Sequence, residues 1–142
     1  MTYVIEAVIA REELLRAATD APLATLAAGW ALLPVRGPSG DELGFWKLTA
    51  ELAASAAEWS KTGPVAYVEA EFWAGVGSQR AVVWEGGEVV FGPVQLEEGD
   101  QPPAEGTAIS QALRRIGVVA EEDQDAFDAV GLGRHRHTAD WV

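Results

Sequence analysis

The sequence predicts one α+β domain over residues 1–142, built on a largely antiparallel five-stranded sheet with three helices packed mainly on one face. Three observations predict this class. Residues 63–93 contain three strand-like segments separated by two glycine turns. The elements follow the order strand, helix, strand, helix, three strands, helix, so that helices are segregated around a run of strands. The length of 142 residues is enough for one core and requires no second domain.

The N-terminal half supplies two strands and two helices. Residues 2–10 are apolar and β-branched at both parities, which predicts a central strand buried on both faces. Residues 11–18 carry acids in their first turn and contain no β-branched side chain, which predicts a short helix. Residues 25–35 predict a second strand, bent at its glycine. A parallel crossover between these two strands stays open, so a mixed sheet is an alternative.

The second helix is expected to be the longest in the chain. Asp41 follows a Gly-Pro-Ser-Gly turn and is a candidate N-cap. Apolar side chains then recur at spacings of three and four, as on one face of a helix. This stripe consists of Phe45, Leu48, Leu52, Ala56 and Trp59. Gly63-Pro64 ends the predicted helix.

The C-terminal half supplies three strands, a helix and a tail. The strands are expected to begin at Val65, Gln79 and Glu88. A polar loop follows at residues 95–106, and Thr107 caps a helix that ends at Gly117. Residues 121–142 are a charge-segregated tail with a short helix at most, which we expect to dock on the domain.

Two hairpins give the predicted sheet its register. A five-residue loop that pairs Trp73 with Gln79 brings apolar side chains together on one face. The Gly86-Gly87 turn pairs Trp84 with Val89 and Val82 with Phe91. In this register the second face is half acidic and half apolar. It carries Tyr67, Glu69, Glu71, Val83, Glu85, Glu88 and Val90.

Glu85 and Glu88 lie opposite each other beside the second turn, a like-charge pair that is destabilising unless it is solvated or bound by a basic group. The acidic face therefore has two interpretations. It is either an ordinary solvated face of a sheet or a docking surface for a basic partner, which it would steer electrostatically.

The charge of the chain excludes several kinds of partner. Acidic residues outnumber Lys plus Arg by 22 to 10, for a net charge of −12. Such a field repels phosphate backbones, so we expect no nucleic-acid partner. No apolar run reaches transmembrane length and the N-terminus does not resemble a signal peptide, so we expect no membrane association. The absence of cysteine fits a cytoplasmic protein and excludes thiolate chemistry.

The glycine-rich segment at residues 75–78 was compared with phosphate-binding loops. Such loops begin a helix and carry a lysine, whereas here a strand follows and no lysine is present. Ser78 has no histidine near it in the sequence to activate it. We therefore predict no catalytic residue and no cofactor.

The tail holds both histidines of the chain in the segment 134–137. His135 and His137 alternate as paired metal ligands do, with Asp140 or an acid from residues 121–128 as a third. The flanking Arg134 and Arg136 oppose a cation, so we predict no metal. The arginines also suit an anionic ligand. The preferred interpretation is pairing of this basic segment with the acidic run 121–128, while Trp141 acts as an apolar peg.

Three segments carry a resemblance to known sequences. They are residues 3–7, residues 67–72 leading into 75–79, and residues 127–134 with the closing Asp140-Trp141. Together they resemble a group of small uncharacterised actinobacterial proteins over nearly the whole chain. The resemblance implies a bacterial cytoplasmic origin and transfers no activity and no catalytic residue.

Two functions remain open at the level of sequence. The first is a non-enzymatic acidic protein-interaction module, resembling the small immunity proteins that neutralise toxins, with a foreign partner or a second copy docking near Trp73. The second is a small-molecule or anion-binding protein, or an enzyme, with a site between the 75–79 loop and the 134–137 tail. The residues expected to contact a partner or ligand are Glu69, Glu71, Trp73, Gln79, Glu85, Glu88, Arg134, His135, Arg136 and His137.

Overall fold

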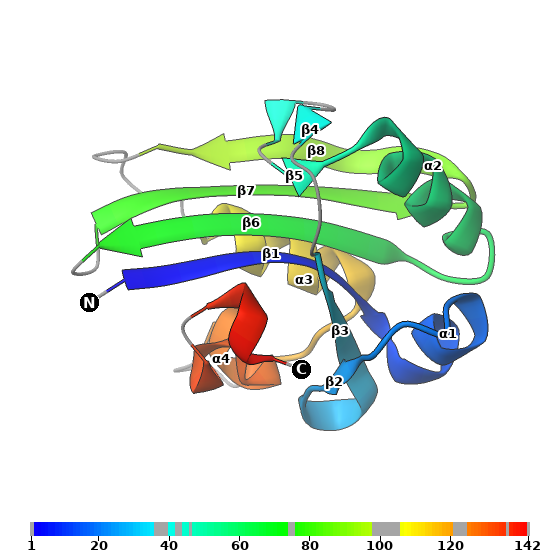
Figure 1. Cartoon of the computed structure of the whole chain (residues 1–142), viewed down its shortest axis with the longest axis horizontal. Coiled ribbons are helices and arrows are strands. Elements are labelled where there is room, and N and C mark those ends of the chain that lie inside the picture. Colours follow the sequence, from blue (N-terminus) through cyan, green and yellow to red (C-terminus); the bar gives the residue numbers. More distant parts are fainter. Residues whose placement is uncertain are drawn as a thin grey trace.

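A six-stranded antiparallel sheet runs through the centre of the computed structural model (Figure 1). The structure describes residues 2–35, 40–41, 44–45, 47–73, 76–97, 106–120, 125–135 and 137–141. In spatial order the strands are β2 (Ala24–Thr25), β3 (Trp30–Pro34), β1 (Thr2–Arg11), β6 (Val65–Trp73), β7 (Val76–Glu85) and β8 (Glu88–Leu96). The predicted α+β class is confirmed, and β1 lies inside the sheet as expected.

The sixth strand arises where one bent strand was expected. The short 3-10 helix η1 (Ala27–Gly29) divides that segment, because Ala28 and Gly29 both have positive φ, at 60° and 87°. The chain therefore folds back, and β2 pairs antiparallel with β3. β1 also pairs antiparallel with β3, which excludes the parallel crossover.

Helices cover both faces of the sheet rather than mainly one. α1 (Glu12–Ala18) and α2 (Ala50–Trp59) pack on one face, and α3 (Ala108–Ile116) and α4 (Ala126–Val130) pack on the other (Figure 1). The central strands are apolar at both parities, so each face must be removed from water. The α2-side core includes Val8, Tyr67, Val82 and Trp84, and the α3-side core includes Ile9, Val68, Val83 and Ile109.

The ends of α3 agree with the prediction, whereas the start of α2 differs from it. Thr107 caps α3 by accepting a hydrogen bond from Ser110 N at 3.3 Å, and Gly117 ends it with φ of 115°, as predicted. α2 begins eight residues later than predicted. Its N-cap is Thr49 and not Asp41, and the Thr49 side chain accepts a hydrogen bond from Leu52 N at 3.0 Å.

The segment before α2 contains two short strands where the longest helix was expected to begin. Within it, β4 (Gly40–Asp41) and β5 (Lys47–Leu48) form a small parallel pair beside the main sheet. Phe45 and Leu48 are buried, as their apolar stripe suggested, but they reach the α2-side core from this segment.

The register of the first hairpin differs from the predicted one. Trp73 pairs with Val76 across residues 74–75, and Gln79 lies opposite Ala70. The apolar alternation could not reveal this shift, since both faces are buried and either register hides apolar side chains. The second hairpin has Trp84 opposite Val89 and Glu85 opposite Glu88, as predicted. Irregular pairing between Ala81 and Trp84 then places Phe91 opposite Val83 instead of Val82.

Candidate functional site

The predicted acidic face divides into a covered part and an exposed part. Glu69 belongs to the covered part and is fully buried, so its assignment to a solvent-facing surface was wrong. Its Oε2 accepts hydrogen bonds from the Tyr67 hydroxyl at 2.6 Å and from the backbone N of Lys47 at 2.8 Å. These two donors replace water at one carboxylate oxygen and fasten β5 onto the sheet.

Tyr67 shares this environment, and the pKa of its phenol is raised well above the ordinary value. Burial is the main cause, followed by the hydrogen bond to Glu69 and by the negative charges of Glu69 and Glu6. The phenol therefore remains a proton donor at neutral pH. This contact is structural, because it holds a buried carboxylate in place.

Glu69 is part of a polar row that crosses four strands. The pairing places Glu6, Glu69, Arg80 and Gln95 side by side on β1, β6, β7 and β8. Arg80 donates to the carbonyl oxygen of Gly44 and forms an ion pair of 3.5 Å with Glu97. This row is not apparent from the sequence, since it exists only in the register that sets Arg80 opposite Glu69.

Glu71 and Gln79 are not brought together. Glu71 is exposed and lies on the α2 side, two residues beyond Glu69 on β6. Gln79 is buried and faces α3, where its Oε1 accepts from the backbone N of Ile109 at 2.9 Å. It thereby satisfies one of the free amides at the start of that helix. Trp73 ends β6, and its side chain lies outside the described part of the structure.

Gly77 gives the glycine-rich segment an ordinary structural explanation. A Cβ at this position would lie 1.8 Å from the carbonyl oxygen of Glu71, so only glycine fits against the neighbouring strand. Gly77 belongs to β7 and not to a loop that begins a helix. Among the described residues, this segment therefore lacks the geometry of a phosphate-binding loop.

The tail is docked, and Trp141 is its apolar peg as predicted. Its indole is only 6% exposed. The His135 ring packs edge-on against it at 4.8 Å, and the Arg134 guanidinium lies over it at 5.3 Å. Arg134 also donates to the Thr25 carbonyl oxygen at 2.5 Å. Arg134 and His135 therefore already serve the attachment of the tail.

The remaining tail predictions are tested only in part. His137 lies 3.5 Å from Asp140, whereas Arg136 and residues 121–124 lie outside the described residues. Pairing of the basic segment with the acidic run therefore stays a prediction. In the part of the chain that the structure describes, no three His, Asp or Glu side chains are grouped closely enough to bind a metal.

Apart from Glu71, the exposed residues of the predicted acidic face lie at the tip of the β7–β8 hairpin. Glu85 and Glu88 are exposed and opposite each other. Val89 and Val90 follow them on β8 with 43% and 39% of their surface exposed. We call these four residues, Glu85, Glu88, Val89 and Val90, the hairpin-tip surface.

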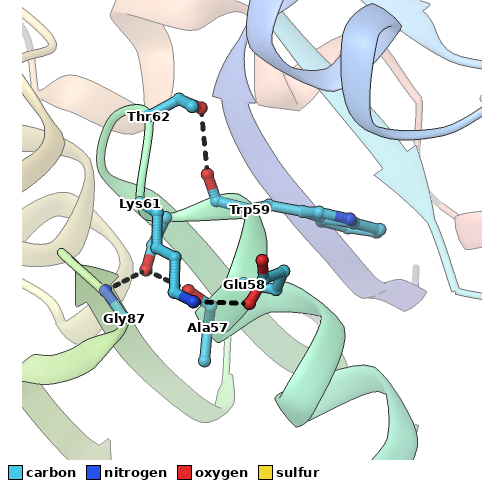
Figure 2. Close-up of polar contacts among 7 residues, drawn as sticks. Ala57, Glu58, Trp59, Lys61, Thr62 and Gly87 are labelled. Atoms are coloured by element: carbon cyan, nitrogen blue, oxygen red, sulfur yellow. Dashed lines mark hydrogen bonds and ion pairs between the residues drawn. The ribbon is translucent and has the colours of Figure 1, made fainter.

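The hairpin tip is anchored to the C-terminal end of α2. The carbonyl oxygen of the buried Ser60 accepts from Gly86 N at 2.9 Å, and its Oγ accepts from Gly87 N at 2.9 Å. The same hydroxyl donates to the Ala57 carbonyl oxygen at 2.6 Å. Figure 2 shows Gly87 beside this helix end, where Lys61 forms an ion pair of 2.8 Å with Glu58. The turn is thus held in place by backbone amides and not by its exposed side chains.

The two edges of the sheet differ in how they are covered. The tail covers the edge at β2 and β1: Arg134 bonds to Thr25, and Thr138 in η4 (Thr138–Asp140) accepts from Glu6 N at 3.1 Å. β8 forms the other edge, and within the described ranges only β7 pairs with it. An edge strand with exposed apolar side chains is a template for pairing with another chain.

A surface hollow of about 410 Å³, which was not predicted from the sequence, lies beside the start of α1. It is lined by Arg11, Glu12, Glu13, Arg16 and Gly29. Its charges are balanced, with Arg16 paired to Glu12 at 2.6 Å and Arg11 stacked 4.2 Å from the Trp30 ring centroid. No single ligand chemistry is favoured by this lining.

Comparisons with protein-family models, with curated proteins and with solved structures found no match. No helix within the described ranges is long and apolar enough to cross a membrane.

Proposed function

We propose that the protein is a non-enzymatic protein-interaction module that docks a basic partner on the hairpin-tip surface. One observation carries the proposal: two exposed carboxylates, Glu85 and Glu88, lie beside two exposed valines on an edge strand. Apolar contact area provides affinity, and the adjacent negative charge selects a basic partner and orients it. The net charge of −12 acts in the same direction at longer range.

The anchoring of the hairpin supports this role. Ser60 fixes the turn through the amides of Gly86 and Gly87, so the surface is held in one conformation before a partner arrives. A preorganised surface loses less entropy when it binds. A small acidic protein with such a surface has the properties expected of an immunity protein that neutralises a basic toxin.

Charge reversal tests the proposal. The double variant Glu85→Lys and Glu88→Lys is compared with the wild type in affinity capture from the native host, and the captured protein is then purified for measurement of its Kd. The control is Glu13→Lys with Asp20→Lys, which makes the same change in net charge at two other exposed acids. We expect the hairpin-tip variant to bind about 100-fold more weakly and the control within about threefold of the wild type.

Equal loss of affinity in both variants would show that only the total charge matters and would contradict the proposed surface. A small molecule retained by the wild type, and lost after Arg134→Ala, would instead support the alternative site between the 75–79 loop and the tail.

A further inference from the structure

We infer that the partner binds by strand addition: an extended basic segment pairs through its backbone with the free edge of β8 at residues 88–91. The inference rests on the proposed function, because it specifies how the same surface is used. It begins from the contrast between the two sheet edges. One is covered by Arg134 and Thr138 from the tail, and the other ends at β8 with no further strand among the described residues.

The available part of β8 is short and has a defined end. Gly92 has φ of 81°, and a Cβ there would lie 2.6 Å from the Ala81 carbonyl oxygen, so only glycine fits at this point, where the pairing with β7 is irregular. Pro93 follows and has no N–H to donate. Pairing with an incoming strand is therefore limited to residues 88–91, which are the residues that carry the exposed valines and Glu88.

The charges at this edge select the occupant. A second copy of the chain would bring its own Glu85 and Glu88 and a second net charge of −12 to the same place, which opposes association. A segment that alternates lysine and valine matches the edge, since its valines meet Val89 on one face of the strand and its lysines meet the carboxylates on the other. The occupant is therefore a basic β-type segment of another protein.

A synthetic nine-residue peptide that alternates lysine and valine is the probe. Binding to the full protein is followed by calorimetry and by the amide NMR signals of β8. The matched control has the same side chains but N-methyl groups on alternate amides, which removes donors on one edge only. We expect the unmodified peptide to shift the signals of residues 88–91 and the methylated peptide to bind about tenfold more weakly, because two backbone hydrogen bonds are lost.

Three outcomes would overturn the inference. They are equal binding of the two peptides, absence of any shift in β8 at millimolar peptide, and a β8-mediated dimer of the protein alone in sedimentation. Equal binding of the two peptides leaves the proposed function intact if charge reversal at Glu85 and Glu88 still weakens binding. The surface would then bind its partner through side chains alone. If the reversal also has no effect, the proposed function fails as well.

Discussion

Glu69 and Glu71 differ in environment although they lie two residues apart on the same side of β6. Glu69 is fully buried beneath β5, whereas Glu71 is exposed. A carboxylate is stable inside a protein only when hydrogen-bond donors replace water, and here Tyr67 and the backbone of Lys47 do so. The sequence could not distinguish the two residues, because the cover comes from a segment more than twenty positions earlier.

Removal of the buried carboxylate is predicted to be costly. Glu69→Ala should lower the free energy of unfolding by about 3 kcal/mol, because the Tyr67 hydroxyl and the Lys47 amide lose their acceptor inside the protein. Glu71→Ala is the matched control and should change it by less than about 0.5 kcal/mol. Urea denaturation measures both. Equal effects would show that Glu69 is not the fastening point of β5.

Both tyrosines of the chain should make the fold less stable at high pH. Burial raises the pKa of Tyr3 and of Tyr67 above the ordinary value of about 10. Below that pH both phenols are protonated in the folded and unfolded states, so their contribution is fully present. Above it only the unfolded chain ionises them, so the stability of the fold decreases as pH rises.

In an alkaline titration, tyrosine ionisation and unfolding should therefore occur in a single transition. We expect tyrosinate absorbance to appear together with the loss of the far-ultraviolet circular dichroism, at a pH above 10. Tyr67→Phe should remove about half of the absorbance change, as one of two tyrosines is lost. Tyrosinate formation near pH 10 in a protein with native circular dichroism would contradict the buried environment.

The tail acts as an element that closes one edge of the sheet. Trp141 is buried with Leu132, Val130 and Ala126 in the α3-side core, and this packing holds Thr138 against the free part of β1. A single aromatic side chain near the C-terminus therefore protects a strand at the other end of the sequence. Its role as a peg was predictable from its isolated apolar character, but the strand that it protects was not.

Trp141→Ala is predicted to release this element. The free energy of unfolding should decrease by about 3 kcal/mol, as for other buried large-to-small changes. The amide of Glu6 should exchange faster with solvent, because its acceptor Thr138 moves away. Val119→Ala removes an apolar side chain that is 88% exposed and serves as the control. Unchanged exchange at Glu6 in the Trp141 variant would show that the edge is closed without the peg.

At the scale of the whole molecule, the sequence was sufficient for the class, the central strand, the capped α3 and the β7–β8 turn. Each depends on local signals: β-branched runs, a threonine cap, paired glycines. It was insufficient for the register of β6 and β7, the extra strand β2 and the polar row at Glu69. These depend on which segment covers which face, and apolar alternation carries little information when both faces are buried.

The candidate site, too, was predictable only where local signals determine the geometry. Glu85 and Glu88 were predicted correctly as an exposed opposed pair, because a two-residue turn fixes their register locally. Glu69, Gln79 and Arg134, which were expected to contact a partner or ligand, make internal hydrogen bonds. The surface that remains is smaller and lies at one edge of the sheet, where charge and exposed apolar area coincide.

The most direct measurement is the rate of association of the purified partner at several salt concentrations, for the wild type, the hairpin-tip variant and the Glu13, Asp20 control. Both variants change the net charge equally, so the overall field predicts equal rates. We expect the hairpin-tip variant to associate more slowly and to lose most of its salt dependence, while the control stays close to the wild type. Identical rates and salt dependence in the two variants would contradict docking at Glu85, Glu88, Val89 and Val90.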